Sequence, residues 1–127
     1  MSLLGAACGS DGDEQLSAAA AARSSALVGP DAFAQRIEAP GVVTINVHTP
    51  DEGSIPGTDL TIAFDRIATS SELPDNRSTP LAVYCRSGNM SADAVDDLEA
   101  LGYTDIVELD GGFNAWTQAD RPLEQPS

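Results

Sequence analysis

The chain has 127 residues and a formal net charge of −14, from twenty acidic residues against six basic ones, all arginine. This length is typical of one domain, and about 100 residues can bury enough surface to be stable without disulfides or metals. The negative charge excludes nucleic acid as a partner and also excludes electrostatic binding to an anionic membrane. With two cysteines and one histidine, we expect neither a metal site nor a structural disulfide.

Residues 1–25 contain few large apolar side chains, and we expect them to form a flexible tether outside the core. Small residues precede Cys8, and an acidic, glycine-containing stretch follows it over residues 9–14. This pattern resembles the end of a bacterial lipoprotein signal, whose cysteine is lipidated. The resemblance implies a lipid on Cys8 and an extracytoplasmic, membrane-anchored protein. The alternative is a cysteine without a role in an unfolded tail.

Residues 26–127 are expected to fold as a single α/β domain in which helices and strands alternate. The predicted elements are a helix over 30–37, a strand over 42–47, a loop over 51–58, a weak helix over 65–73, a strand over 81–84, a helix over 91–101, a strand over 105–109 and a short helix over 112–117. This alternation predicts a mainly parallel sheet covered on both faces. In such sheets, the functional site lies at the carboxyl ends of the strands.

Cys85 follows the 81–84 strand directly and precedes a helix whose predicted start is Ser91. Backbone amides and the positive end of a helix dipole favour a thiolate, and helix N-termini commonly lower the pKa of a cysteine. Gly88 allows the backbone to curl so that several amides can converge on one anion, and Arg86 adds a positive charge. Cysteine can also be buried as a small apolar side chain. The order of strand, cysteine, glycine and serine-capped helix favours a nucleophile instead.

The segment 83–91, with the sequence Val-Tyr-Cys-Arg-Ser-Gly-Asn-Met-Ser, resembles the active-site loop of single-domain rhodaneses. These proteins are sulfurtransferases that carry a persulfide on cysteine. The Ile-Pro-Gly turn at 55–57 is similar to a mid-domain turn of the same family. The ending over 101–116 is similar too, because a glycine pair precedes an alanine-tryptophan helix. The resemblance implies a rhodanese-like, five-stranded, mostly parallel sheet with helices on both faces.

The resemblance also implies a mechanism, in which the Cys85 thiolate takes a sulfur atom from a sulfane donor and holds it as a persulfide. The sulfur then passes to a thiol, cyanide or another nucleophilic acceptor. The backbone amides of the loop would bind the persulfide, which assigns substrate contacts to Arg86, Ser87, Gly88, Asn89, Met90 and Ser91. No cofactor is required, the partners would be a small sulfur donor and acceptor, and the chain is expected to be a monomer.

Three positions depart from the family pattern. Met90 stands where the family often has arginine or another polar residue, which weakens the case for thiosulfate as the donor. Asn46 and His48 stand where the family commonly has aspartate and arginine, and we expect a structural or surface role for His48.

Two other functions compete with sulfur transfer. A cysteine phosphatase would need an arginine six residues after its cysteine to grip a phosphoryl group, and that position is Ser91. The remaining alternative is a sulfur carrier, redox sensor or binding module of the rhodanese-like type, tethered to the cell envelope and with little turnover.

Overall fold

The computed structural model describes residues 25–125, so the candidate lipid site at Cys8 lies outside the described residues. Five strands are β1 (Ser25–Val28), β2 (Val43–Asn46), β3 (Leu60–Thr61), β4 (Leu81–Tyr84) and β5 (Ile106–Leu109). The helices within this range are α2 (Pro30–Glu38), α3 (Asn89–Ala100), α4 (Gly112–Gln118) and the short 3-10 helix η1 (Ile67–Thr69). None of these helices is long and apolar enough to cross a membrane.

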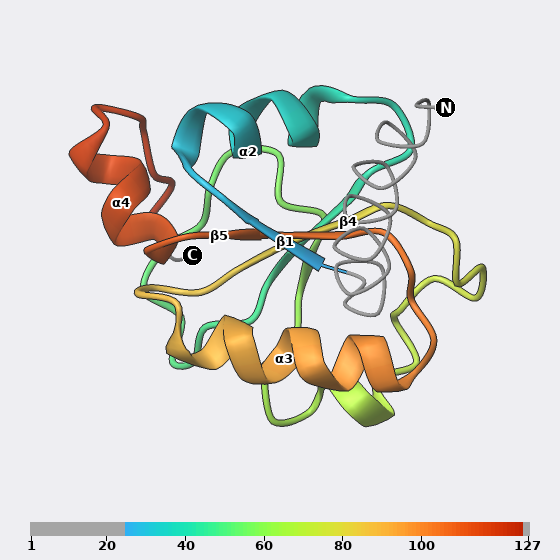
Figure 1. The fold of residues 1–127 in the computed structure, drawn as a ribbon. Helices are drawn as coiled ribbons and strands as arrows, with labels where there is room; N and C mark the ends of the chain where they lie inside the picture. The colour runs from blue at the N-terminus through green and yellow to red at the C-terminus, as the bar shows by residue number, and fades with distance from the viewer. Residues whose placement is uncertain (1–24, 126–127) are drawn as a thin grey trace, which may run out of the picture.

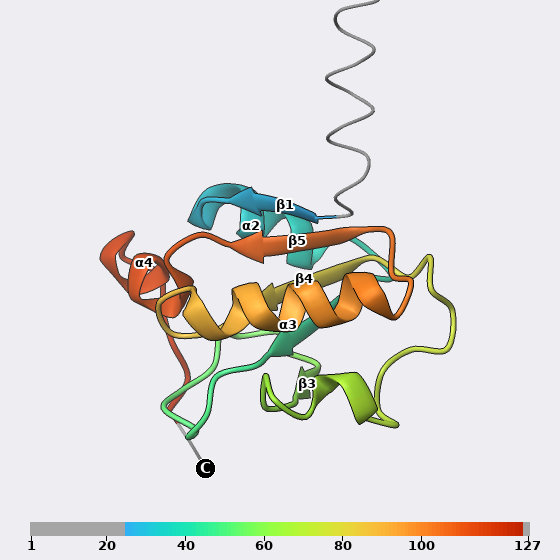
Figure 2. The same ribbon diagram turned by 60° about the horizontal axis from the view of Figure 1, so that its bottom comes forward.

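The five strands form one parallel sheet in the order β1-β5-β4-β2-β3. Helix α2 covers one face of this sheet and α3 covers the other (Figure 1), and η1 packs alongside α3. Helix α4 joins the core on the α2 side, beyond the carboxyl end of β5 (Figure 2). The predicted α/β fold class is therefore confirmed. All four residues of the central strand β4 are buried, and the strand ends next to Cys85.

Side chains of β4 alternate between two apolar cores, because successive residues of a strand point to opposite faces of the sheet. Leu81 and Val83 pack in the core under α3, whereas Ala82 and Tyr84 pack in the core shared by α2 and α4. The second core contains four aromatic rings in edge-to-face contact, which belong to Phe33, Tyr84, Phe113 and Trp116. These contacts fix α2 and α4 to the strand that leads into the cysteine loop.

Helix α3 begins at Asn89, two residues before the start predicted from the sequence. Its N-cap is Gly88, which has a left-handed φ of 114° and provides no side-chain cap. The prediction of a serine-capped helix is therefore wrong. Ser91 is fully buried in the first turn, where its hydroxyl donates a hydrogen bond to Glu108 on β5.

The segment 65–73 is not the predicted weak helix, because only the three residues of η1 are helical there. Ile67 is the single buried residue of η1, and short helices depend on packing for their stability. The sequence patterns do not predict the two edge strands, β1 and β3. These strands form by pairing with β5 and β2, and β1 includes Ser25, the last residue of the expected tether.

Candidate active site

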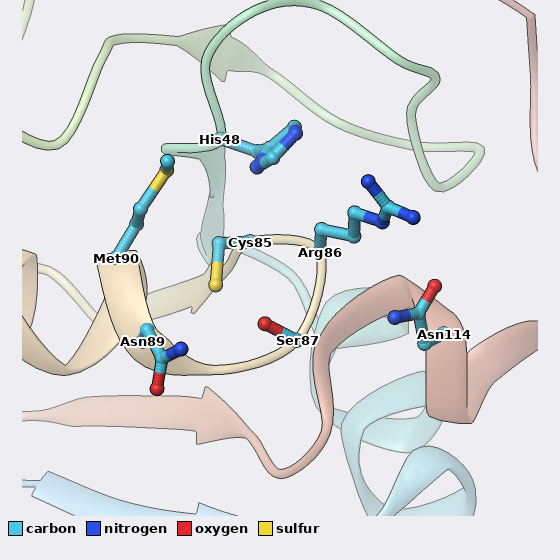
Figure 3. A pocket seen from close by; sticks show the side chains of 7 residues that line it. All are labelled: His48, Cys85, Arg86, Ser87, Asn89, Met90 and Asn114. Atoms are coloured by element: carbon cyan, nitrogen blue, oxygen red, sulfur yellow. The ribbon is translucent and has the colours of Figure 1, made fainter.

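Three neighbouring strands end at one edge of the sheet, where they place the candidate active site. His48 follows β2, Cys85 follows β4, and the glycine pair after β5 leads into α4. Between them lies a pocket of about 390 Å³ that seven residues line: His48, Cys85, Arg86, Ser87, Asn89, Met90 and Asn114. Figure 3 shows Cys85 in the centre of this group, with Met90 on one side of it and Arg86 on the other.

The first turn of α4 holds the cysteine loop through two backbone hydrogen bonds. The Phe113 N–H donates to the carbonyl oxygen of Cys85 at 2.9 Å, and the Asn114 N–H donates to that of Arg86 at 3.0 Å. Gly112 has a φ of 59°, and a Cβ at this position would lie 2.4 Å from both carbonyl oxygens. Only glycine permits so close an approach of two backbones. The glycine pair therefore holds the loop in place.

The sulfur of Cys85 lies at the floor of the pocket, in a residue that is 1% exposed. The Gly88 N–H donates to Sγ at 3.0 Å, and it is the one amide within residues 25–125 that is hydrogen-bonded to the sulfur, whereas the sequence predicts that several loop amides converge there. The N-terminus of α3, whose dipole favours a negative charge, adjoins it. This environment suits an anionic sulfur, because it offers a donor and a positive dipole end.

A buried carboxyl group lies behind the sulfur. Ser91 Oγ is 3.5 Å from Cys85 Sγ and donates to Glu108 Oε2 at 2.6 Å. Glu108 is only 9% exposed, and burial raises the pKa of its carboxyl. The hydrogen bond from Ser91 opposes this increase in pKa, whereas the negative charges of Asp110 and Asp96 add to it.

Two of the residues that line the pocket, His48 and Arg86, share the carboxylate of Glu52 as a partner. His48 Nε2 lies 2.9 Å from Glu52 Oε1, and Arg86 Nη1 lies 3.2 Å from the same oxygen. The His48 ring also packs edge-on against the ring of Phe113. Its expected structural or surface role is therefore incomplete, because this buried ring also lines the pocket. The Arg86 guanidinium pairs with Glu52 and is not free to serve the sulfur alone.

The structure brings together all the site residues that the sequence predicts within the described range. Five of them line the pocket, Gly88 provides the amide donor, and Ser91 lies beneath the sulfur.

Sequence reasoning missed three groups, namely Glu52, Glu108 and Asn114. The places of Glu108 and Asn114, at the end of β5 and the start of α4, were the available signal. Within residues 25–125, no three His, Cys, Asp or Glu side chains lie close enough together to hold a metal ion.

The parallel α/β sheet with a cysteine loop at the carboxyl end of its central strand places this chain among α/β proteins whose candidate site is built around a thiol. The model of the Rhodanese-like domain family matches residues 29–119, which is most of the chain. The chain therefore belongs to the rhodanese-like family, as the loop and the glycine-tryptophan ending predict.

One named relative and one solved structure agree with this assignment, and a third protein of similar sequence is uncharacterized. The chain is 32% identical to thiosulfate sulfurtransferase GlpE of Pseudomonas fluorescens over 98 residues, which cover 68% of this chain and 81% of that protein. It is 28% identical to an uncharacterized protein of Synechocystis and spans 59% of the length of that relative. A rhodanese-like domain protein from Staphylococcus aureus has a similar crystal structure, with a TM-score of 0.63 and 30% identity over 80% of this chain and 98% of that one.

Proposed function

We propose that this domain is a sulfurtransferase that carries sulfane sulfur as a persulfide on Cys85 and passes it to a thiol or another nucleophilic acceptor. The observation that carries the proposal is the Gly88 N–H at 3.0 Å from Sγ, at the floor of a pocket next to the start of α3. Membership of the rhodanese-like family and the sulfurtransferase name of a relative support the reaction type.

The reaction has two displacements at sulfur. In the first, the Cys85 thiolate attacks the outer sulfur of a donor, the donor's S–S bond breaks, and the leaving group departs with the electron pair. The outer sulfur stays on Cys85 as a persulfide anion. In the second, an acceptor thiolate attacks this outer sulfur and the Cys85 thiolate leaves with its electron pair. No external oxidant or reductant is needed, and the loop donor stabilises the negative charge on the sulfur.

The pocket favours a small, weakly charged sulfur donor. Cys85 is almost fully buried, so only a narrow group such as a sulfur chain can reach Sγ. Met90 places an apolar thioether beside it, and the positive charge of Arg86 is shared with Glu52. A polysulfide with one negative charge therefore suits the site better than the dianion thiosulfate.

Mass spectrometry after exposure to a polysulfide tests the assignment. The full chain should gain the mass of one sulfur atom, and a thiol acceptor should then remove it. Cys85→Ser should abolish this gain and all transfer, whereas Cys8→Ser should retain both. The assignment of Cys85 fails if the Cys85→Ser variant still transfers sulfur.

The second candidate is a sulfur carrier or sensor with little turnover. Met90 and the Arg86–Glu52 pair favour it, because both reduce the electrostatic attraction of the pocket for an anionic donor. Loading in a single turnover without steady-state transfer would distinguish this role from that of an enzyme.

A phosphatase is less suitable, because position 91 holds a buried serine bonded to a carboxyl group. Phosphate binding at this position would need a cation.

We further propose that the protein is anchored outside the cytoplasm through a lipid on Cys8 and is otherwise a monomer. The small residues before Cys8 and the acidic stretch after it support the anchor. Within residues 25–125, Leu27 is the one exposed large apolar side chain, which leaves little apolar surface for self-association. Metabolic labelling with a fatty-acid analogue should mark the full-length protein but not Cys8→Ala, and equal labelling of both would refute the anchor.

A further inference from the structure

The buried carboxyl of Glu108 has no part in the sulfur displacements described above, yet it is connected to Cys85 by two short contacts. Glu108 lies on the α3 face of β5, and Ser91 stands in the first turn of α3 between this carboxyl and Sγ. The two contacts measure 2.6 Å from Ser91 Oγ to Oε2 and 3.5 Å from Ser91 Oγ to Sγ. A buried carboxyl this close to a nucleophile can affect its protonation.

The Ser91 hydroxyl has one hydrogen and two nearby oxygen acceptors, which are Glu108 Oε2 at 2.6 Å and the Gly88 carbonyl at 3.2 Å. The Cys85 thiol donates to Ser91 Oγ, with Sγ at 3.5 Å, and a thiolate at the same place would be a third acceptor. When Glu108 is ionised, it takes this hydrogen, and a lone pair of Ser91 Oγ can accept the S–H of Cys85. When Glu108 is protonated, it donates to Ser91, whose own hydrogen can then turn to a Cys85 thiolate. A thiolate accepts this hydrogen bond more strongly than a neutral thiol does, because the thiolate carries a negative charge.

We propose that Glu108 is a positioning residue that shares one proton with Cys85 through Ser91, so that the reactive sulfur anion forms while the carboxyl becomes neutral. In this step, the Cys85 S–H bond breaks as a new O–H bond forms on Ser91. The original Ser91 O–H bond breaks as an O–H bond forms on Glu108 Oε2. One proton moves inward, and the total charge of the three groups does not change.

The surroundings of Glu108 favour a state in which Glu108 and Cys85 together carry one negative charge over a state in which both are ionised. Its neighbours on β4 and β1 are the apolar Val83 and Leu27. The charges that act on it from α3 and from the end of β5 are those of Asp96 and Asp110, and both are negative. No ion pair within residues 25–125 includes Glu108, and the guanidinium of Arg86 pairs with Glu52 instead. Two interacting groups of this kind titrate as a pair.

The test measures the rate of Cys85 alkylation by iodoacetamide against pH, in the full chain with Cys8→Ser to remove the other thiol. Glu108→Gln imitates the protonated carboxyl, because its amide is neutral, has a similar shape and can donate to Ser91, and it should therefore make Cys85 reactive at lower pH. We expect about three- to tenfold faster alkylation below the wild-type midpoint, as for removal of one nearby like charge. Asp96→Asn is the matched control, because it removes an adjacent charge without touching Ser91, and it should change the rate less than twofold.

Ser91→Ala separates a hydrogen-bonded connection from repulsion through space. In this background, the shift caused by Glu108→Gln should fall to less than half. An unchanged profile in Glu108→Gln, an equal shift in Asp96→Asn, or an equal Glu108→Gln shift with and without Ser91 would each overturn the proposal.

A second measurement needs no variant at Glu108 and therefore does not depend on how well the variants fold. NMR titration of the Glu108 carboxyl carbon should show a second inflection at the pH where Cys85 becomes reactive, because coupling between two sites is reciprocal. Capping Cys85 with iodoacetamide should remove that inflection, and its persistence would overturn the proposal. The inference rests on the proposed function only in needing a reactive Cys85 anion. Alkylation requires no sulfur donor, so failure of sulfur transfer and failure of proton sharing give different results.

Discussion

The two sides of the Cys85 sulfur differ in exposure and in the charges that they carry. Behind the sulfur, Ser91 is fully buried and Glu108 is 9% exposed, and no cation in the described part of the chain, residues 25–125, pairs with its carboxyl. In front of it, Arg86 is 54% exposed and shares Glu52 with His48. The inner side therefore holds an unscreened acid, whereas the outer side holds a charge network that water and salt can reach.

This difference assigns different tasks to the two sides. Under the proposed function, a donor molecule would enter from the pocket, so the outer side and Met90 would affect which donors bind. Ser91 and Glu108 do not line the pocket and, under the proposal for Glu108, would affect the protonation of Cys85. Changes on the outer side should alter donor selectivity and salt dependence, and changes on the inner side should alter pH dependence.

The largest loss of sulfur transfer is expected from a change that moves the cysteine loop, because the groups in front of and behind the sulfur both depend on the position of this loop. Gly112→Ala would place a Cβ 2.4 Å from the backbone of Cys85 and Arg86, so the loop must move. A displacement near 1 Å at a reactive group can cost about a hundredfold in rate, and we expect a loss of that order in sulfur transfer. Gly41→Ala is the matched control, because Gly41 also has positive φ but nothing lies within 4 Å of its Cβ position. Its transfer rate should stay within twofold of wild type, and an equal loss in both variants would contradict the role given to Gly112.

The next effect concerns the donor side of the pocket. Met90→Arg supplies a cation beside the sulfur, and charge-assisted hydrogen bonds contribute about 1.5–3 kcal/mol. Transfer from thiosulfate should therefore increase about tenfold or more, if the guanidinium reaches the donor. Transfer from a singly charged polysulfide should increase less, and Met90→Leu serves as the uncharged control. Comparison of kcat/KM for the two donors measures this selectivity, and an equal change for both donors contradicts the role given to Met90.

A smaller effect is expected from Glu52→Gln, which releases Arg86 and His48 from their shared carboxylate. Exposed ion pairs contribute about 0–1 kcal/mol and are screened by salt. The kcat/KM for thiosulfate should therefore increase about two- to fivefold at low ionic strength and approach the wild-type value in high salt. Asp51→Asn, next to it in the sequence, controls for general charge. A gain that does not depend on salt would show that Glu52 acts in another way.

The smallest effect is expected on the inner side, in the pH dependence of stability. Burial raises the pKa of Glu108 above its ordinary value of 4.5, so the folded protein binds this proton more tightly than the unfolded chain does. The resulting stability is complete below about pH 4.5 and is lost as pH rises through the raised pKa. The free energy of unfolding of Glu108→Gln, relative to wild type, should therefore increase as pH rises through this window. Urea unfolding at several pH values measures it, and a constant difference would show that the carboxyl does not titrate abnormally.

Local sequence patterns were sufficient for the elements that have strong signals of their own. The run 81–84 is a continuous apolar segment, and β4 has the same boundaries. The glycine pair and the apolar positions after it likewise predicted α4 from its first residue. The rhodanese-like family and the place of Cys85 at the end of a strand followed from these segments, because each signal lies within a few neighbouring residues.

Other features exist only because distant segments meet in the folded chain. The edge strands β1 and β3 are short and form by pairing with β5 and β2. The sequence predicts Ser91 as a helix cap, but in the folded domain its hydroxyl donates a hydrogen bond to the carboxyl of Glu108, seventeen residues away. His48 reaches the pocket because β2 lies beside β4 in the sheet. Through local patterns, the sequence by itself thus determined the family and the place of the candidate nucleophile at the end of a strand. Tertiary structure decided the surroundings of the nucleophile, because burial and hydrogen bonding between separate strands and helices depend on the packing of the whole sheet.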